Sequence, residues 1–340
     1  MTLVKISILL ATFCAALLGS GMVRRYALRA KLLDIPNSRS SHAAPTPRGG
    51  GLAIALSSLA ASSVLACIDL VDTKTILALF AGGAIALVGF LDDRRQLSAK
   101  LRFIVHMSAA IVAVAILGGV PVDFFGSLGL NNYWVGAGLA VVVFAWATNL
   151  FNFMDGIDGI AGTEAATIGA GVALLALVHL DVVGLGTGLF GAATAGAALG
   201  FLRWNWQPAK LFMGDVGSVP LGYLLGWLLL TLAGAGYWAP ALILPLYFLA
   251  DASWTLLRRL ARGENVWQPH RQHFYQRAVQ AGQSHAAVVL RVLAADIVLI
   301  GAALWATEES EIPALVLAVA SVALLLAELS RPARRAMEAS

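Results

Sequence analysis

Charged residues are scarce in this chain. Lys, Arg, Asp and Glu make up 12% of its 340 residues, whereas 59% are hydrophobic. An ordinary soluble domain carries about 25% charged residues. The composition therefore excludes a typical water-soluble globular protein and predicts that lipid is the solvent for most of the chain.

Cysteine is almost absent as well, with only two residues. Cys14 and Cys67 both fall within apolar segments, so their spacing gives neither a metal-ligand motif nor a disulfide framework. We expect both thiols to be packing residues.

Long apolar runs recur along the whole sequence, and each is close to the roughly 20 residues that a helix needs to cross a bilayer. We predict about eleven transmembrane helices in an all-α polytopic membrane protein. They cover approximately residues 3–22, 50–70, 75–91, 102–120, 133–150, 159–178, 182–202, 216–234, 238–257, 287–306 and 312–328. The first run precedes the basic stretch at 24–31, which is typical of a retained helix and not of a cleaved signal peptide.

The basic residues divide unequally between the two faces of the membrane. With the amino terminus outside, only Lys5 and Lys74 of the 23 Lys and Arg residues fall on the outer face. Because positive charge is retained in the cytoplasm, this distribution predicts the orientation. The net charge of +4 then describes topology, and no nucleic-acid partner is expected.

Polar residues that could carry chemistry are concentrated in the loops on the inner face. These residues are Asp92, Asp93, Lys100 and Arg102 after the third span, Asn152, Asp155 and Asp158 after the fifth, Phe212 and Asp215 after the seventh, and His270, Arg271 and His273 after the ninth. Loops that lie on one face can converge, so the sequence predicts one site built from several of them.

The acidic residues suggest a divalent cation. Adjacent Asp92 and Asp93 repel each other unless a cation lies near them. Mg²⁺ takes a few hard oxygen ligands and completes its shell with water and phosphate oxygens, which suits these carboxylates. Taken singly, each motif also has a plainer interpretation: an acidic pair beside arginines is often a solvated helix end, and Asp-Gly-Ile-Asp-Gly can be a turn that caps a helix.

Taken together, the motifs resemble a known family. The Asp-Asp pair with downstream Lys100, the run Asn-x-x-Asn-x-x-Asp-Gly-x-Asp-Gly at 149–159, Phe-Met-Gly-Asp-x-Gly-Ser at 212–218 and a histidine-bearing fifth loop occur in this order. This pattern resembles the polyprenyl-phosphate N-acetylhexosamine-1-phosphate transferase superfamily, glycosyltransferase family 4. The segments 33–51 and 269–273 are most similar to the branch that initiates O-antigen or common-antigen chains, in particular the Pseudomonas-type enzymes that use UDP-activated N-acetylated hexosamines, including deoxysugars.

The resemblance implies an activity and a set of roles. The enzyme would transfer N-acetylhexosamine 1-phosphate from a UDP-sugar to undecaprenyl phosphate and release UMP, with Mg²⁺ or Mn²⁺ as cofactor. The implied metal ligands are Asp215, Asn152 and Asp93, and the implied catalytic residues are Asp92 (as base), Asp93, Asp155 and Lys100. The uridine would be bound by Asp158 and Phe212. The phosphates or the sugar would be bound by Arg271, His273, Arg48 and Arg102. One departure concerns the fifth loop, where Tyr275 and Gln276 replace histidines of the relatives.

The same resemblance predicts the organisation of the chain. Residues 1–340 would form a single integral transferase domain in the bacterial inner membrane, with catalytic loops at about 23–49, 92–101, 149–159, 203–218 and 258–286 on the cytoplasmic face. Membrane lipids are expected partners, and homodimers occur in the superfamily. A groove open sideways to lipid, beside the ninth span, should admit the lipid acceptor.

Two other functions stay open at this point. The first is the phospho-MurNAc-pentapeptide transferase of peptidoglycan synthesis, a less similar branch of the same superfamily. The second is a cation-coupled transporter that would use Asp251, Glu164 and His106 inside the spans. The concentration of acids at one interface disfavours the transporter. Asp251 could instead be paired with Arg258 near the membrane surface.

The charge distribution generates a topology test. We expect green fluorescent protein fused after Ser340 to be fluorescent and alkaline phosphatase at the same point to be inactive, because an odd number of spans places the tail in the cytoplasm. Fusions in the 69–75 loop serve as the opposite-face control. An active phosphatase at the carboxyl terminus would contradict the eleven-span topology.

Overall fold

The computed structural model has a helical bundle with very little sheet. It describes residues 2–36, 44–68, 70, 73–95, 97–118, 132–179, 183–266, 268, 270–307 and 310–331, and for residues 2, 93–95 and 99 it describes the backbone alone. The helices are α1 (Thr2–Arg29), α2 (Gly51–Cys67), α3 (Thr73–Arg95), α4 (Ala99–Leu117), α6 (Tyr133–Met154), α7 (Ile160–Val178), α9 (Leu185–Asn205), α10 (Asp215–Gly234), α11 (Trp238–Ile243), α12 (Leu246–Ala261), α13 (Phe274–Gln280), α14 (His285–Trp305) and α15 (Glu311–Leu329).

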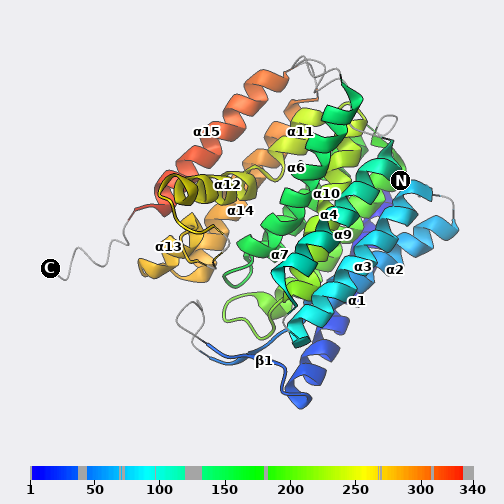
Figure 1. Ribbon diagram of the computed structural model, residues 1–340. Helices are drawn as coiled ribbons and strands as arrows, with labels where there is room; N and C mark the ends of the chain where they lie inside the picture. The colour runs from blue at the N-terminus through cyan, green and yellow to red at the C-terminus, as the bar shows by residue number, and fades with distance from the viewer. Residues whose placement is uncertain are drawn as a thin grey trace.

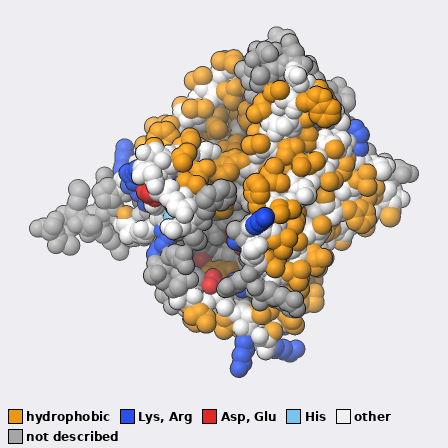
Figure 2. Space-filling view, in the orientation of Figure 1, with side chains coloured by type: hydrophobic (Ala, Val, Ile, Leu, Met, Phe, Trp, Pro, Cys, Tyr) orange, Lys and Arg blue, Asp and Glu red, His pale blue; other side chains and the backbone are white. Residues whose placement is uncertain are grey.

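The long helices are those of a multi-pass membrane protein, as predicted. Within the described part of the chain, nine helices are long and apolar enough to span a bilayer, and α2 is a shorter apolar helix of 17 residues. Figure 1 shows most of the long helices running side by side. Apolar side chains also cover much of the flank seen in Figure 2, which is the surface expected to face lipid.

The prediction of one continuous span at 238–257 is wrong. This segment forms two helices, α11 and α12, that meet at Leu244 and Pro245. Proline has no backbone N–H to donate, and its ring clashes with the carbonyl four residues earlier, so it interrupts a helix. After the break α12 lies across the direction of α14 and α15 (Figure 1). The Pro245 signal was available in the sequence.

Glycine allows the bundle helices to approach one another closely. A Cβ atom added to Gly196 of α9 would lie 2.2 Å from the Leu9 carbonyl oxygen of α1, and one added to Gly200 would lie 2.3 Å from the Phe13 carbonyl oxygen. Gly169 of α7 and Gly191 of α9 face each other in the same way. Small residues are the usual means of helix packing in lipid, where the hydrophobic effect gives no preference for helix contact over lipid contact.

A small hairpin lies at one end of the bundle, which we call the site end. Strand β1 (Leu33–Asp34) pairs antiparallel with β2 (Thr46–Pro47), and Figure 1 shows this hairpin beside the lower ends of the helices. The ends of α3, α6 and α9 and the starts of α4, α7 and α10 meet at the site end, as the contacts described below establish. The fold thus gathers there the loops that the sequence predicted to converge.

The two cysteines differ from the prediction. Both Cys14 and Cys67 have exposed side chains on the surface of the bundle. They are therefore not packing residues, and the apolar character of their helices is satisfied by the surrounding lipid.

The close α1–α9 crossing generates a stability test. We expect Gly196→Ala to destabilise the protein by roughly 1–3 kcal/mol, because the added methyl group must displace the backbone of α1. Gly301→Ala is the matched control, since a Cβ at this membrane helix position meets nothing within 4 Å. The measurement is thermal unfolding in detergent, followed by size-exclusion chromatography. Equal melting temperatures for the two variants would contradict the crossing.

Candidate functional site

An arginine joins two of the predicted carboxylates at the site end. The Arg102 guanidinium, from α4, lies 2.9 Å from Asp92 Oδ2 at the end of α3 and 3.5 Å from Asp215 Oδ2 at the start of α10. Asp92 is buried, and its Oδ1 accepts a hydrogen bond from the Leu97 N–H. Figure 2 shows acidic side chains inside a hollow at this end of the molecule. Three separate helices therefore contribute to one charged cluster.

The start of α10 depends on a glycine. Gly214 has φ +74°, a conformation that other residues adopt only with strain, and it turns the chain so that α10 begins at Asp215. The positive end of the helix dipole favours the carboxylate at this position. One turn later, Ser218 donates a hydrogen bond to Asn152 Oδ1 of α6 at 2.9 Å. Asn152 is thus held by Ser218, which lies one turn after Asp215 on the facing helix.

Asp155 follows directly after α6 and has an unusual electrostatic environment. Burial, then the negative charges of Asp215 and Asp158, raise the pKa of Asp155 to about 7. The raised pKa shows that nearby positive side chains do not fully offset the burial of Asp155 and the negative charges beside it. A bound cation would relieve this repulsion.

Asp158 is fixed in the loop between α6 and α7. Its Oδ2 accepts a hydrogen bond from the Ala209 N–H at 3.0 Å, and the Asp158 N–H donates to His285 Nδ1. Asn205 accepts from the next residue, Gly159. The side chain is buried, so a uracil base would have to approach it at the edge that these contacts leave accessible.

Arg48 and Phe212 lie side by side on paired backbone segments. The two residues form a parallel β-bridge, in which the Phe212 N–H donates to the Pro47 carbonyl and the Gly50 N–H donates to the Phe212 carbonyl. The hairpin therefore fixes the predicted phosphate-binding residue beside the predicted uridine-stacking residue. This register is formed by hydrogen bonds between backbone groups.

The fifth loop is organised around Asp251, a fully buried acid in α12. Its Oδ1 lies 3.2 Å from His273 Nδ1 and accepts from the Phe274 N–H at 3.1 Å, and its Oδ2 accepts from the Tyr275 N–H at 3.4 Å. A negative charge at these N–H groups suits the start of α13. The interpretation that Asp251 pairs with Arg258 is wrong, because Asp251 instead holds the predicted ligand-binding loop.

Tyr275 and Gln276 have structural roles in the fifth loop. Tyr275 is buried and donates from its hydroxyl to the Phe153 carbonyl, and Gln276 Oε1 accepts from the His273 N–H. Burial, followed by the charges of His273 and Arg259, lowers the pKa of His270 to about 4, so the His270 ring is neutral at neutral pH. These contacts join the fifth loop to the 153–158 segment.

Three predicted site residues, Lys100, Arg271 and Asp93, remain to be placed. Lys100 is exposed near the start of α4, and Arg271 is half-buried in the fifth loop, where its carbonyl accepts from Gln280. The Asp93 side chain lies outside the described part of the structure. The other residues of the predicted site, from Arg48 to His273, do gather at the site end.

The donor set fits a hard divalent cation. Asp215 and Asp155 supply negative charge, and Asn152 supplies an amide oxygen. Among the described side chains, no group of three or more acidic, histidine or cysteine residues is arranged as a complete metal cage. Mg²⁺ does not need one, because it commonly binds to one or two carboxylates together with waters and substrate phosphates.

Sequence reasoning missed several residues that position this site. Ser218, Asn205 and His285 hold Asn152, Gly159 and Asp158, respectively. Asp251 was recognisable because an acid inside a span is expensive in lipid and usually functional. His285 gave no such signal, since it stands outside the quoted motifs, at the start of α14.

The residues of the transporter hypothesis are buried in the bundle. His106 Nδ1 of α4 lies 2.9 Å from Asn149 Oδ1 of α6. Glu164 of α7 lies near Asp296 of α14, and Asp251 holds the fifth loop.

The fold and the site together define a class: an all-helical, multi-pass membrane protein with an acidic, arginine-bearing site at one end. A family model for glycosyl transferase family 4 matches residues 75–233. A probable undecaprenyl-phosphate N-acetylglucosaminyl 1-phosphate transferase of Bacillus subtilis is 31% identical, over 83% of this chain and 79% of its own length. The chain belongs to the polyprenyl-phosphate N-acetylhexosamine-1-phosphate transferase superfamily, glycosyl transferase family 4, which confirms the resemblance seen in the motifs.

Two further relatives represent different branches. A decaprenyl-phosphate N-acetylglucosaminephosphotransferase of Mycolicibacterium smegmatis is 32% identical, over 93% of this chain and 86% of its own length. A phospho-N-acetylmuramoyl-pentapeptide-transferase of Rickettsia bellii is 31% identical, over 57% of this chain and 61% of its own length. The N-acetylglucosamine-type relatives therefore match a larger part of the chain.

The role of Asp251 can be tested without an activity assay. We expect Asp251→Asn to accelerate trypsin cleavage after Arg271 and Arg277 by about tenfold or more, because a hydrogen bond to a charged acceptor contributes about 1.5–3 kcal/mol. Glu311→Gln is the control, since this acid lies in the first turn of α15, at the opposite end of that helix from Leu329. Cleavage at the wild-type rate in a folded Asp251→Asn variant would contradict the positioning role.

Proposed function

We propose that this protein transfers an N-acetylhexosamine 1-phosphate from a UDP-sugar to undecaprenyl phosphate at the cytoplasmic face of the bacterial inner membrane. The observation that carries the proposal is the cluster of Asp92, Arg102 and Asp215 beside Asn152 and Asp155 at one end of a membrane bundle. Such a position suits a reaction between a lipid-anchored phosphate and a nucleotide sugar that arrives from water. The orientation rests on the positive-inside rule.

The reaction is an in-line displacement at phosphorus. An oxygen of the lipid phosphate forms a bond to the β-phosphorus of the UDP-sugar, the bond to the UMP oxygen breaks, and UMP leaves with the electron pair. Enzymes accelerate such transfers chiefly by positioning the reactants and stabilising charge on the phosphoryl oxygens. Mg²⁺, which Asp215, Asn152 and Asp93 would hold, would supply part of the compensating positive charge.

Arg102 has two sets of partners available during this reaction. Before the donor binds, Arg102 pairs with Asp92 and Asp215. The donor diphosphate carries more charge than a single carboxylate, so the guanidinium turns toward it. Asp92 Oδ2 is then free to accept a proton from the lipid phosphate. The family resemblance assigns the donor phosphates and sugar to Lys100, Arg271, His273 and Arg48.

We assign the uridine of the donor to Phe212 and Asp158. Phe212 offers an aromatic face for the uracil ring, and Asp158 offers a hydrogen-bond acceptor near it. Arg48, which the β-bridge fixes beside Phe212, would then meet the phosphate that follows the uridine. Asp155 supports the cluster through its charge and its place between Asp158 and Asp215.

The sugar and the pathway require a direct assay. The motif at 269–273 favours initiation of O-antigen or a related surface polysaccharide with a UDP-N-acetylhexosamine or its deoxy form. The alternative is the phospho-N-acetylmuramoyl-pentapeptide transfer named for the Rickettsia bellii relative. Purified protein, undecaprenyl phosphate, Mg²⁺ and a panel of UDP-sugars would be incubated and the lipid products weighed by mass spectrometry. We expect a lipid diphosphate sugar that disappears with EDTA and returns with Mg²⁺ or Mn²⁺.

Substitutions separate the chemical from the binding roles. We expect Asp215→Asn and Asp92→Asn each to lower kcat about 100-fold or more, because each removes charge or proton acceptance at the reacting phosphates. Phe212→Ala should chiefly raise KM for the UDP-sugar, since a stacking surface contributes about 1–3 kcal/mol and the backbone pairing with Arg48 survives. Phe103→Ala, at an exposed position of α4, is the control. An unchanged KM in folded Phe212→Ala would remove the uridine from this position.

A further inference from the structure

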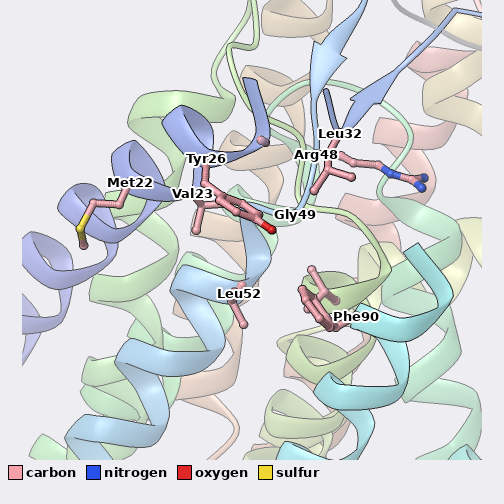
Figure 3. Close-up of a pocket in the computed structure, with 10 residues that line it drawn as sticks. Met22, Val23, Tyr26, Leu32, Arg48, Gly49, Leu52 and Phe90 are labelled. Atoms are coloured by element: carbon pink, nitrogen blue, oxygen red, sulfur yellow. The ribbon is translucent and has the colours of Figure 1, made fainter. Parts of the chain in front are cut away.

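An apolar cavity lies on the flank of the bundle beneath the hairpin. It has a volume of about 290 Å³ and is lined by residues of α1, α2, α3 and the start of α10, including Val23, Leu52, Phe90 and Val216. Figure 3 shows these side chains surrounding the space between α1 and α2. Met22 and Tyr26 line its α1 side and are 64% and 54% exposed, so the cavity is accessible from the surface that faces lipid.

The cavity lies near one end of α1. Met22 and Tyr26 fall within the last two turns of α1, which ends at Arg29. At about 1.5 Å per residue they lie roughly 5–10 Å from the helix end. Amphipathic helices at a membrane surface are buried about 5–10 Å into the boundary between headgroups and acyl chains, so we expect the cavity to lie near that boundary. A lipid of the adjacent leaflet would then reach the cavity without leaving the membrane.

The rim of the cavity carries positive charge. Arg29 follows Tyr26 by three residues on α1, so the two side chains share one face of the helix. On the other side, Arg48 lines the cavity from the hairpin, and Figure 3 shows its guanidinium extending away from Met22. Basic groups at the boundary of an apolar cavity are complementary to a lipid phosphate.

We propose that this cavity binds one acyl chain of an anionic phospholipid, with the phosphate held at the rim by Arg29 and Tyr26. The volume suits part of one chain, because cavities for small ligands begin at about 300 Å³. The cationic rim selects an anionic headgroup over a zwitterionic one. The bound phospholipid is a separate molecule from the lipid acceptor, whose phosphate must reach the acidic cluster.

The lipid would support the hairpin that reaches the candidate site. Leu32 and Arg48 both line the cavity, and the Arg48 N–H donates to the Leu32 carbonyl at 3.3 Å. The neighbouring Pro47 carbonyl accepts from the Phe212 N–H at 2.8 Å. Filling the cavity therefore stabilises the segment that carries Arg48 and Phe212. This consequence for donor binding rests on the proposed function, whereas the binding site itself does not.

Photo-crosslinking tests the binding directly. The full chain is placed in nanodiscs of phosphatidylcholine that contain a small fraction of phosphatidylglycerol with a diazirine on one acyl chain, and crosslinked residues are mapped by mass spectrometry. We expect labelling of the α1 and α2 cavity residues. Leu52→Trp, which fills the cavity, and Arg29→Gln, which removes a rim charge, should each reduce it at least fivefold. Leu10→Trp, at an exposed position nearer the other end of α1, should not.

Three results would overturn the proposal. The first is equal cavity labelling by diazirine phosphatidylcholine, which would show that the rim does not select an anionic lipid. The second is loss of labelling when undecaprenyl phosphate is added at an equal mole fraction, which would assign the cavity to the acceptor. The third is unchanged labelling in folded Arg29→Gln, which tests the rim even if Leu52→Trp fails to fold.

The functional consequence has its own readout. We expect phosphatidylglycerol to lower KM for the UDP-sugar several-fold in the wild type and in Leu10→Trp but not in Leu52→Trp, with kcat similar in all three. An absence of any transferase activity would contradict the proposed function and leave the crosslinking result valid. A lipid effect on KM that persists in Leu52→Trp would contradict the coupling through the hairpin.

Discussion

The site depends on the compensation of negative charge collected at one end of a membrane bundle. Arg102 bridges Asp92 and Asp215, while burial, followed by the negative charges of Asp215 and Asp158, raises the pKa of Asp155 to about 7. The Arg102 and Asp215 side chains are 38% and 30% exposed, and ion pairs between such partly exposed groups contribute only about 0–1 kcal/mol. The bridge is therefore weak enough for a metal ion and substrate phosphates to replace it. The carboxylates can therefore pair with Arg102 when no substrate is bound, and can bind a metal ion or accept a proton when substrate is present.

The membrane determines how that cluster is built. Lipid cannot satisfy backbone polar groups, so irregular segments must lie at the bundle ends or be held by protein contacts. The break at Pro245 is tolerated because α11 and α12 pack against neighbouring helices, and the buried Asp251 of α12 accepts the N–H groups that start α13. The hairpin is held by the 212–213 backbone in the same manner. Both segments are thus held by contacts with another part of the chain.

The sequence predicted the helices better than their interruptions and partners. Apolar runs and the charge asymmetry predicted the multi-pass fold, because lipid imposes both patterns on the chain. The motifs predicted the convergence of Asp92, Asn152 and Asp215 through their resemblance to a family. Contacts such as Asp158 with His285 and Asp251 with His273 were not predictable, since they join residues 127 and 22 positions apart through packing that has no local signal. The Pro245 break was readable but was overlooked within a long apolar run.

The competition between Arg102 and a divalent cation is the most direct point at which to test this site. Mn²⁺ binding to the purified protein, without nucleotide, can be measured by electron paramagnetic resonance for the wild type and for Arg102→Gln. We expect the variant to bind Mn²⁺ several-fold more tightly, and at most about tenfold, because a competing ion pair of roughly 1 kcal/mol is removed. Unchanged or weaker Mn²⁺ binding in a folded Arg102→Gln variant would show that Arg102 and the metal do not share these carboxylates.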